Sequence, residues 1–288
     1  MQKLILGTVQ MGLDYGINNN DGKISNQNSQ LILKRAFELG VKTLDTAEVY
    51  GNAHQVIGDF HKKNRDCNFK IITKLPHDIK TDSIETKVLN YLKILFVSSI
   101  DVLMFHSFES FKSNNELINL LLKLKSNGYI KNIGVSVYSN HHLEDLLNED
   151  SISVVQLPFN MLDNFSIRGQ ILNKLKKRGK IIHTRSSFLQ GLFFKDLNDD
   201  ISIVKKLKTE LSIVNQISKQ LNCSIEELAL SYCINQKNID NVIIGVDNIF
   251  HLESNIKSSK FKIGKDNIES INNIKVKNLD LLNPSLWN

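Results

Sequence analysis

The chain has 288 residues, of which 41% are hydrophobic and 23% charged, and its formal net charge is +6. This composition is that of an ordinary globular protein, and the length allows one large core, as in an α/β barrel. No apolar run approaches the roughly 20 residues of a membrane-spanning helix. The first fifteen residues also lack the apolar core of a signal peptide, so we expect a cytoplasmic protein without membrane contact.

Neither the cysteines nor the basic residues point to a special class of ligand. The three cysteines (Cys67, Cys223 and Cys233) are widely spaced and fit neither a disulfide framework nor a zinc site, so we predict no metal. Most basic residues are lysines scattered among Asn, Ser and Glu, and the densest cluster, "KLKKR" (174–178), lies within one helical segment. We interpret them as solvated helix faces rather than a nucleic-acid site, although mild basicity helps to attract an anionic ligand.

Short apolar runs alternate along the chain with longer amphipathic segments. The predicted strands are 3–7, 41–45, 69–74, 100–106, 130–136, 152–156, 180–185 and 241–245. Apolar spacing of three and four residues predicts helices at 29–40 and 115–128, and Ser224 with Glu227 forms a predicted capping box at the start of another.

This alternation predicts parallel strands joined by helical crossovers. The count of eight favours a (β/α)₈ TIM barrel, an α/β fold, over an open doubly wound sheet. We expect one domain over residues 1–288, with extra helices between Phe188 and the eighth strand and a tail from Lys275.

Polar side chains stand at or just after the ends of seven predicted strands. They are Thr8, Asp45, Lys74, His106, Ser136, Gln156 and Arg185. In a barrel these positions meet at the C-terminal rim, where such enzymes have their active sites. For a single polar strand end, a cap or a loop contact is the usual explanation. Seven convergent ends, four of them ionisable, favour a pocket.

One set of residues suits the reduction of a carbonyl group. It consists of Asp45 and Tyr50, both in the stretch "TLDTAEVYG" (43–51), with Lys74 and His106 from later strand ends. A phenol has an unperturbed pKa near 10, and the ammonium group of Lys74 would stabilise its phenolate. The carboxylate of Asp45 would compensate the buried ammonium, and His106 would donate a hydrogen bond to the carbonyl oxygen. Together they would protonate an oxygen as negative charge develops on it.

These residues resemble a known family. "LDTAEVYG", with "ITK" and "MFH" downstream, is similar to the signature of the aldo-keto reductases, and "ILGTVQMG", "NIGVS", "VVQLPFN", "RSSFLQGLF" and "VIIGVDNIFHLESN" extend the resemblance over nearly the whole chain. The resemblance implies that Tyr50 is the general acid in reduction, that Lys74 and Asp45 tune it, and that His106 orients the carbonyl. "GLDYGINN" (12–19) is similar to a bacterial subgroup often associated with surface-polysaccharide biosynthesis.

The resemblance also implies a nicotinamide cofactor, bound without the G-x-G-x-x-G motif that this sequence lacks. Ser136 and Gln156 match positions that hold the carboxamide, and Arg185 matches the position beside the nicotinamide ring. The other implied cofactor residues are Gly7, Thr8, Ser186, Leu189, Gly191, Gly245, Asp247, His251 and Asn255.

The form of the cofactor depends on the loop after the eighth strand. Relatives that bind the 2′-phosphate of NADP often have Lys and Arg at the positions of Gly245 and His251, and here Asp247 lies between them. A carboxylate would repel a phosphate and accept a hydrogen bond from a free ribose hydroxyl. NADPH is predicted first on the habit of the family, and NADH or dual use is the second prediction.

The predicted partner is a small carbonyl compound, with a sugar as one candidate, and the predicted state is a monomer or weak oligomer. Two other functions stay open: a lyase that uses Lys74 as a Schiff-base amine, and a slow cofactor-binding sensor barrel. Of the remaining residues, we expect His183 to be a satisfied barrel residue and Glu48 to face its loop or solvent. For Trp287, folding over the pocket mouth and fraying are equal expectations.

Overall fold

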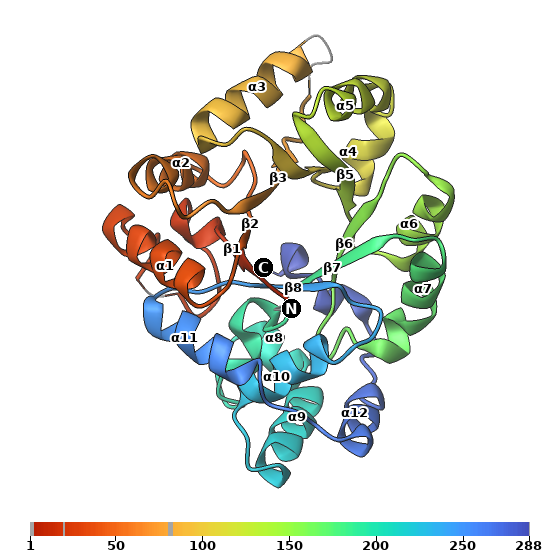
Figure 1. Cartoon of the computed structure of the whole chain (residues 1–288). Coiled ribbons are helices and arrows are strands. Elements are labelled where there is room, and N and C mark those ends of the chain that lie inside the picture. The colour runs from red at the N-terminus through yellow and green to blue at the C-terminus, as the bar shows by residue number, and fades with distance from the viewer. Residues whose placement is uncertain (1–2, 20, 80–82, 288) are drawn as a thin grey trace.

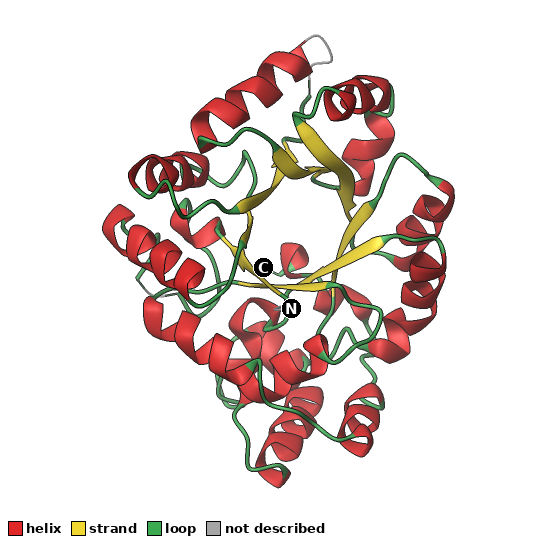
Figure 2. Ribbon diagram, viewed as in Figure 1, coloured by secondary structure: helices red, strands yellow, loops and turns green. Residues whose placement is uncertain are grey.

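The strands close into a barrel, and the helices surround it (Figures 1 and 2). The structure is a computed structural model that describes residues 3–19, 21–79 and 83–287. Each strand pairs in parallel with its neighbours in chain order, and β1 pairs with β8. The strands are β1 (Leu4–Gly7), β2 (Thr43–Asp45), β3 (Lys70–Leu75), β4 (Ile100–Phe105), β5 (Ile130–Ser136), β6 (Val154–Pro158), β7 (Ile181–Arg185) and β8 (Asn241–Ile244). The predicted (β/α)₈ barrel is confirmed.

Twelve α-helices lie within the described residues. They are α1 (Asn26–Glu38), α2 (Ala53–Lys63), α3 (Ile84–Leu95), α4 (Phe108–Ser113), α5 (Leu117–Ser126), α6 (Asn140–Asp145), α7 (Phe165–Lys177), α8 (Ser202–Lys206), α9 (Lys208–Gln220), α10 (Ile225–Ile234), α11 (Ile249–Ser258) and α12 (Lys265–Asn272). The extra helices expected before the eighth strand are α8, α9 and α10, which lie together at the bottom of Figure 1.

The core has two layers because side chains on a strand alternate between its faces. The larger cluster lies between the strands and the helices and includes Leu4, Leu6 and Ile71. The smaller cluster consists of Ile5, Ile72, Val102, Met104, Val154 and Ile243. Ile5 lies between two residues of the larger cluster, so the smaller one fills the inside of the barrel. The barrel is therefore a packed core, and the space for a ligand is left at its rim.

Most boundaries differ from the predictions by one or two residues. The predicted capping box is confirmed: the Glu227 N–H donates to Ser224 Oγ, and the Ser224 N–H donates to Glu227 Oε2. The helix expected over 115–128 spans Leu117–Ser126 and is preceded by α4, which the sequence pattern did not predict. The Ser110 N–H donates to Ser107 Oγ at the start of α4, and this cap is the signal that the pattern search missed.

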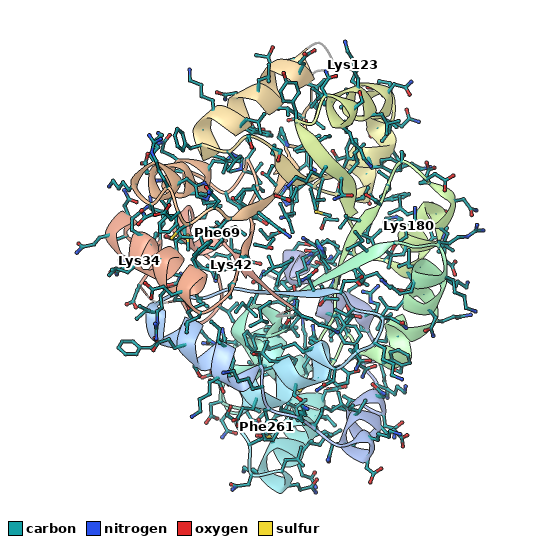
Figure 3. All side chains as sticks on the ribbon, in the orientation of Figure 1. Lys34, Lys42, Phe69, Lys123, Lys180 and Phe261 are labelled. Carbon is teal, nitrogen blue, oxygen red and sulfur yellow. The ribbon has the colours of Figure 1, made fainter. Side chains whose placement is uncertain are left out.

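The outer helices carry the scattered lysines. Lys34 on α1 and Lys123 on α5 are exposed on the outside of the barrel (Figure 3). Across the described residues, no helix combines the length and the apolar character that crossing a membrane requires. The same residues contain no group of three or more His, Cys, Asp or Glu side chains placed to hold a metal ion, and all three cysteines are free thiols.

Candidate active site

A buried ion pair joins the ends of β2 and β3. Lys74 Nζ lies 2.6 Å from Asp45 Oδ1 and donates a second hydrogen bond, of 3.0 Å, to the Thr46 carbonyl oxygen. Gln156 Nε2 donates to the other carboxylate oxygen, Asp45 Oδ2, at 2.8 Å. Burial lowers the pKa of Lys74, but the charges of Asp45 and Tyr50 outweigh burial and raise it above its usual value. The amine is therefore held as an ammonium ion.

Tyr50 stands above this ion pair. Lys74 Nζ lies 5.3 Å from the centroid of the Tyr50 ring, over its face. The loop that carries the tyrosine is bonded to β3, because the Thr46 N–H donates to the Ile72 carbonyl and the Glu48 N–H donates to the Lys74 carbonyl. The ammonium and the phenol thus lie on two backbone segments that hydrogen bonds hold side by side.

Two glycines allow the loops after β1 and β2 to touch through their backbones. A methyl group added at Gly12 would lie 1.8 Å from the carbonyl oxygen of Tyr50. At Gly51, where φ is +51°, an added methyl group would lie 2.3 Å from the Gly12 carbonyl oxygen. Any side chain at either position would push the two loops apart, so both glycines help to place Tyr50.

His106 faces Tyr50 from the end of β4. The two ring centroids are 5.9 Å apart at an interplanar angle of 76°, and the ring of the exposed His77 stacks on His106 with a centroid distance of 5.3 Å. Burial, followed by the charges of Lys74, His77 and Arg185, lowers the pKa of His106 to about 3. Its ring is therefore neutral near pH 7 and can donate one hydrogen bond without adding charge. Its Nδ1 is buried and bonds to no described residue.

A second layer of polar residues fixes this arrangement from outside. Glu48 pairs with Lys87 Nζ on α3, at 2.8 Å and 2.9 Å, and accepts a short hydrogen bond from the Tyr91 hydroxyl. Glu48 therefore bonds to α3 while 35% of its side-chain surface stays exposed to solvent. His54 Nε2 and Thr73 Oγ1 are 2.8 Å apart, which ties α2 to β3 beside Lys74.

A cavity of about 580 Å³ opens beside Tyr50 and Asp45. Residues on or just after β1, β2, β7 and β8 line it, together with Gln156 on β6 and residues on α10 and α11, so it reaches from the ion pair to the far side of the rim. This volume lies within the usual range for small-molecule and cofactor sites. The lining includes these predicted site residues: Gly7, Thr8, Asp45, Tyr50, Gln156, Arg185, Ser186, Gly191, Gly245, Asp247, His251 and Asn255.

Four predicted site residues do not line this cavity. Lys74 is covered by its partners, with 1% of its surface exposed, and Ser136 and Leu189 are buried as well. His106 contacts Tyr50 but stands beside the cavity rather than in its lining. The geometry thus brings the four predicted catalytic residues together, with Tyr50 and Asp45 on the surface of the cavity and Lys74 behind them.

The loops after β1 and β7 are bonded to each other where they line the cavity. The Ile17 N–H donates to the Gln190 carbonyl oxygen at 3.2 Å, and Asn18 Nδ2 donates to the Gly191 carbonyl oxygen at 2.5 Å. Gln190 Nε2 also donates to the Tyr15 hydroxyl at 2.9 Å. Gln190 and Gly191 have positive φ values of 53° and 94°, a local conformation that the sequence pattern did not predict.

The end of the cavity next to α11 carries carboxylates. Asp247 Oδ2 lies 3.5 Å from His251 Nδ1, while Asp247 Oδ1 is buried and bonds to no described residue. The pKa of His251 is raised, mainly by its hydrogen bond to Asp247. Burial opposes this shift, and the charges of Asp247 and Glu226 add to it. Glu226 also lines the cavity and was not predicted, because it belongs to the first turn of α10, far from any strand end.

Two expectations about single residues need correction. His183 is buried inside the barrel as expected, but its Nδ1 has no partner among the described residues, so it is not fully satisfied. Trp287 neither covers the mouth nor frays: its Nε1 donates to the Leu281 carbonyl oxygen at 3.0 Å, its side chain packs against the core, and it does not line the cavity.

Comparisons with known proteins bear on the family and on the fold. The model of the family described as Aldo/keto reductase family matches residues 3–276. An NADH-specific methylglyoxal reductase of Escherichia coli is 21% identical over 326 residues, covering 94% of this chain and 99% of the relative. An L-glyceraldehyde 3-phosphate reductase of Escherichia coli is 23% identical over 288 residues, covering 85% and 83%. The holo form of an aldo-keto reductase from Bacillus halodurans superposes with a TM-score of 0.79 at 19% identity, covering 94% and 91%.

Proposed function

Since this chain belongs to the aldo/keto reductase family, we propose that it reduces the carbonyl group of a small molecule to an alcohol with a nicotinamide dinucleotide as hydride donor. The observation that carries this proposal is the phenol of Tyr50 on the cavity surface, with the ammonium of Lys74 5.3 Å from its ring. The two relatives named above reduce methylglyoxal and L-glyceraldehyde 3-phosphate, which are small carbonyl compounds.

In this proposal Tyr50 donates its proton to the carbonyl oxygen as the hydride reaches the carbon. The bound cofactor supplies the hydride, which no side chain can provide. The ammonium of Lys74 stabilises the phenolate that Tyr50 becomes, and Asp45 keeps that ammonium charged. The neutral ring of His106 donates a hydrogen bond that orients the carbonyl oxygen. Such positioned proton transfer contributes roughly 10²- to 10⁴-fold to a rate.

The cavity lining fits an elongated dinucleotide. Tyr50 and Gln156 line it beside the ion pair, Ser186 and Gly191 line it from the loop after β7, and Asn255 lines it from α11. Gln156 already gives one amide N–H to Asp45, so only its remaining amide groups are available to a carboxamide. These residues would hold the nicotinamide, the pyrophosphate and the adenosine part, in that order.

NADPH, which the family resemblance favours, and NADH are the two candidate donors, and we rank NADH first. Asp247 and Glu226 line the adenosine end, and Arg185, at the opposite end, is the only Lys or Arg among the lining residues that the structure describes. The unpartnered Asp247 Oδ1 would accept from a ribose hydroxyl and repel a 2′-phosphate. Fluorescence titration of both reduced cofactors decides between them, and tighter binding of NADPH would put NADPH first, as the sequence alone predicts.

The two alternatives from the sequence are less well supported. A Schiff-base lyase needs a neutral amine, whereas Lys74 is held as an ammonium ion by Asp45 and Thr46. A sensor barrel would bind the cofactor and turn over slowly, but nothing in the site favours this. The cytoplasmic location, the sugar substrate, the monomeric or weakly associated state and the link to polysaccharide biosynthesis stay predictions from the sequence.

The test of the proposal is Tyr50→Phe, assayed with both reduced cofactors on a panel of aldehydes, ketones and keto-sugars. We expect this variant to bind cofactor normally and to lose roughly 10²- to 10⁴-fold in kcat. Tyr129→Phe is the matched control, because Tyr129 directly precedes β5 at the opposite end of the barrel from the site. Undiminished reduction by Tyr50→Phe would disprove the assignment of the proton donor. Tight cofactor binding without turnover by the wild type would support the sensor.

A further inference from the structure

Arg185 presents a guanidinium group to the cavity without a bonding partner. The residue ends β7, lines the cavity and is partly buried. Its Cζ lies 4.0 Å from the centroid of the Tyr138 ring. Contact with the face of an aromatic ring fixes a guanidinium but does not use its N–H donors, which lie in the guanidinium plane. Among the described residues, none accepts a hydrogen bond from these donors or pairs with them. Tyr138 thus holds the group with its donors free.

Two carboxylates near Arg185 are already occupied: Asp163, on whose pKa the charge of Arg185 acts, and Asp45, which lines the same cavity. Asp45 uses one oxygen for Lys74 and the other for Gln156. Asp163 accepts from Arg168 through both of its oxygens, at 2.6 Å and 2.7 Å. A rearrangement that gave either carboxylate to Arg185 would strip a buried cation of its partner, which is costly. The charge of Arg185 therefore stays uncompensated.

The uncompensated charge stands next to the reacting groups. The charge of Arg185 acts on Lys74 and on His106, which places it at the carbonyl end of the cavity rather than near Asp247. Lys74 is neutralised by Asp45, and His106 carries no charge near pH 7. A bound nicotinamide ring would bring no negative charge to the guanidinium in either redox state, so a compensating anion would have to come from another bound group. The most direct source of such an anion is the substrate.

We propose that Arg185 binds an oxyanion group, a carboxylate or a phosphate, on the carbonyl substrate, with Tyr138 as the platform that orients the guanidinium. A planar guanidinium matches such groups through two parallel N–H···O bonds. The chemical class of substrate is therefore an acidic aldehyde or ketone, such as an oxo acid or a phosphorylated aldose. This inference rests on the proposed reductase function and narrows its substrate.

The test compares substrates that differ only in charge. We suggest 4-oxobutanoate against its methyl ester, and glyceraldehyde 3-phosphate against glyceraldehyde. In the wild type, kcat/KM should be roughly 10- to 100-fold higher for the charged member of at least one pair, as expected for hydrogen bonds to a charged group. The preferred pair tells whether the anion is a carboxylate or a phosphate. Because this comparison needs no variant, it does not depend on whether a mutant folds.

Substitutions then assign the preference to Arg185. In Arg185→Met the ratio of charged to neutral kcat/KM should fall toward one, mainly through KM, and in Arg185→Lys it should fall only in part, because the charge stays while the planar fork is lost. Tyr138→Leu, which removes the platform, should lower the ratio, whereas Tyr138→Phe, which keeps the ring, should retain it. Cofactor titration of Arg185→Met separates a second source of the anion: if that variant loses cofactor affinity and keeps the ratio, Arg185 binds the cofactor pyrophosphate and the proposal is wrong.

Failure of this inference differs from failure of the proposed function. If the wild type reduces neutral carbonyl compounds as well as acidic ones, and Tyr50→Phe abolishes both activities, the reductase stands and the role of Arg185 is refuted. If no member of either pair is reduced while sugars without acidic groups are, the acidic substrate class is likewise refuted. If the wild type reduces nothing, the proposed function itself fails.

Discussion

Two buried ion pairs in this barrel have similar components and different surroundings. Arg168 on α7 bonds to Asp163 through two parallel hydrogen bonds and to Asn140 Oδ1 through a third. This pair does not line the cavity. Lys74 and Asp45, at the rim, lie beneath the phenol of Tyr50, and Asp45 is part of the cavity surface. The number of hydrogen bonds therefore does not distinguish the two pairs. They differ in their surroundings, because only the Lys74–Asp45 pair borders the cavity and the phenol of Tyr50.

The largest effect that this comparison predicts is on turnover when the rim pair is broken. Lys74→Met removes the cation that stabilises the phenolate, so kcat should fall by roughly 10²- to 10⁴-fold. The purified variant is compared with the wild type by steady-state kinetics, with circular dichroism to confirm folding. If kcat stays within a factor of about three, the rim pair is as structural as the other one.

Breaking the Arg168–Asp163 pair should lower stability without lowering turnover. Arg168→Met leaves the carboxylate of Asp163 buried without its cation, and such losses lower the free energy of unfolding by about 3–5 kcal/mol. Urea unfolding at pH 7 measures the loss, and kcat per folded molecule should be that of the wild type. Arg168→Lys keeps the charge and loses the bidentate bond, so its free energy of unfolding should lie between those of the wild type and Arg168→Met. A loss of kcat without a loss of stability would overturn the distinction.

Acid should weaken the rim region because its buried histidines resist protonation. Burial lowers the pKa of His54 and of His183 to about 4, and for both the charge of Lys74 lowers it further. The unfolded chain takes up these protons near pH 6.5 and the folded chain near pH 4. The stabilisation is therefore complete above pH 6.5 and is lost as pH falls toward 4.

Between pH 7 and pH 5 we expect the free energy of unfolding to fall by about 2 kcal/mol for each of these two histidines. Urea unfolding across this range measures the slope, and His54→Gln should reduce it. An unchanged slope in that variant would mean that His54 is protonated equally in the folded and unfolded chains.

The smallest effect is expected at the surface. Lys174 Nζ lies 2.9 Å from Glu144 Oε1, a distance similar to those in the two buried pairs, but both side chains are exposed. Water and salt screen such a pair, so Lys174→Ala should leave Tm within the scatter of replicate thermal scans. A clear shift in Tm would show that the exposure of an ion pair does not indicate how much it stabilises this barrel.

The parts of the site that lie on strands could be predicted from the sequence. Asp45 and Lys74 end neighbouring parallel strands, so the topology alone brings their side chains to one rim. Tyr50 follows within a short loop, which limits how far it can lie from them. Pattern and strand order were therefore sufficient for the ion pair and its phenol.

The contacts between loops could not be predicted in this way. Tyr138 meets Arg185 only because the backbone after β5 turns toward the end of β7, and no periodicity records that turn. Glu48 bonds to Tyr91 because α3 packs behind its loop, a tertiary contact between residues 43 positions apart. The bonds of Gln190 depend on a left-handed backbone at a residue other than glycine, which local preference argues against.

Gly12 and Gly51 touch through their backbones, so the loops after β1 and β2 must be exchanged together when this barrel is recombined with another. A chimaera that took the β1 loop from another barrel and kept the native β2 loop would bring a side chain against the Tyr50 carbonyl unless the donor also had glycine at that position. Crossovers placed between residues 12 and 51 should therefore yield folded barrels with a displaced tyrosine. Exchange of the whole segment should preserve it.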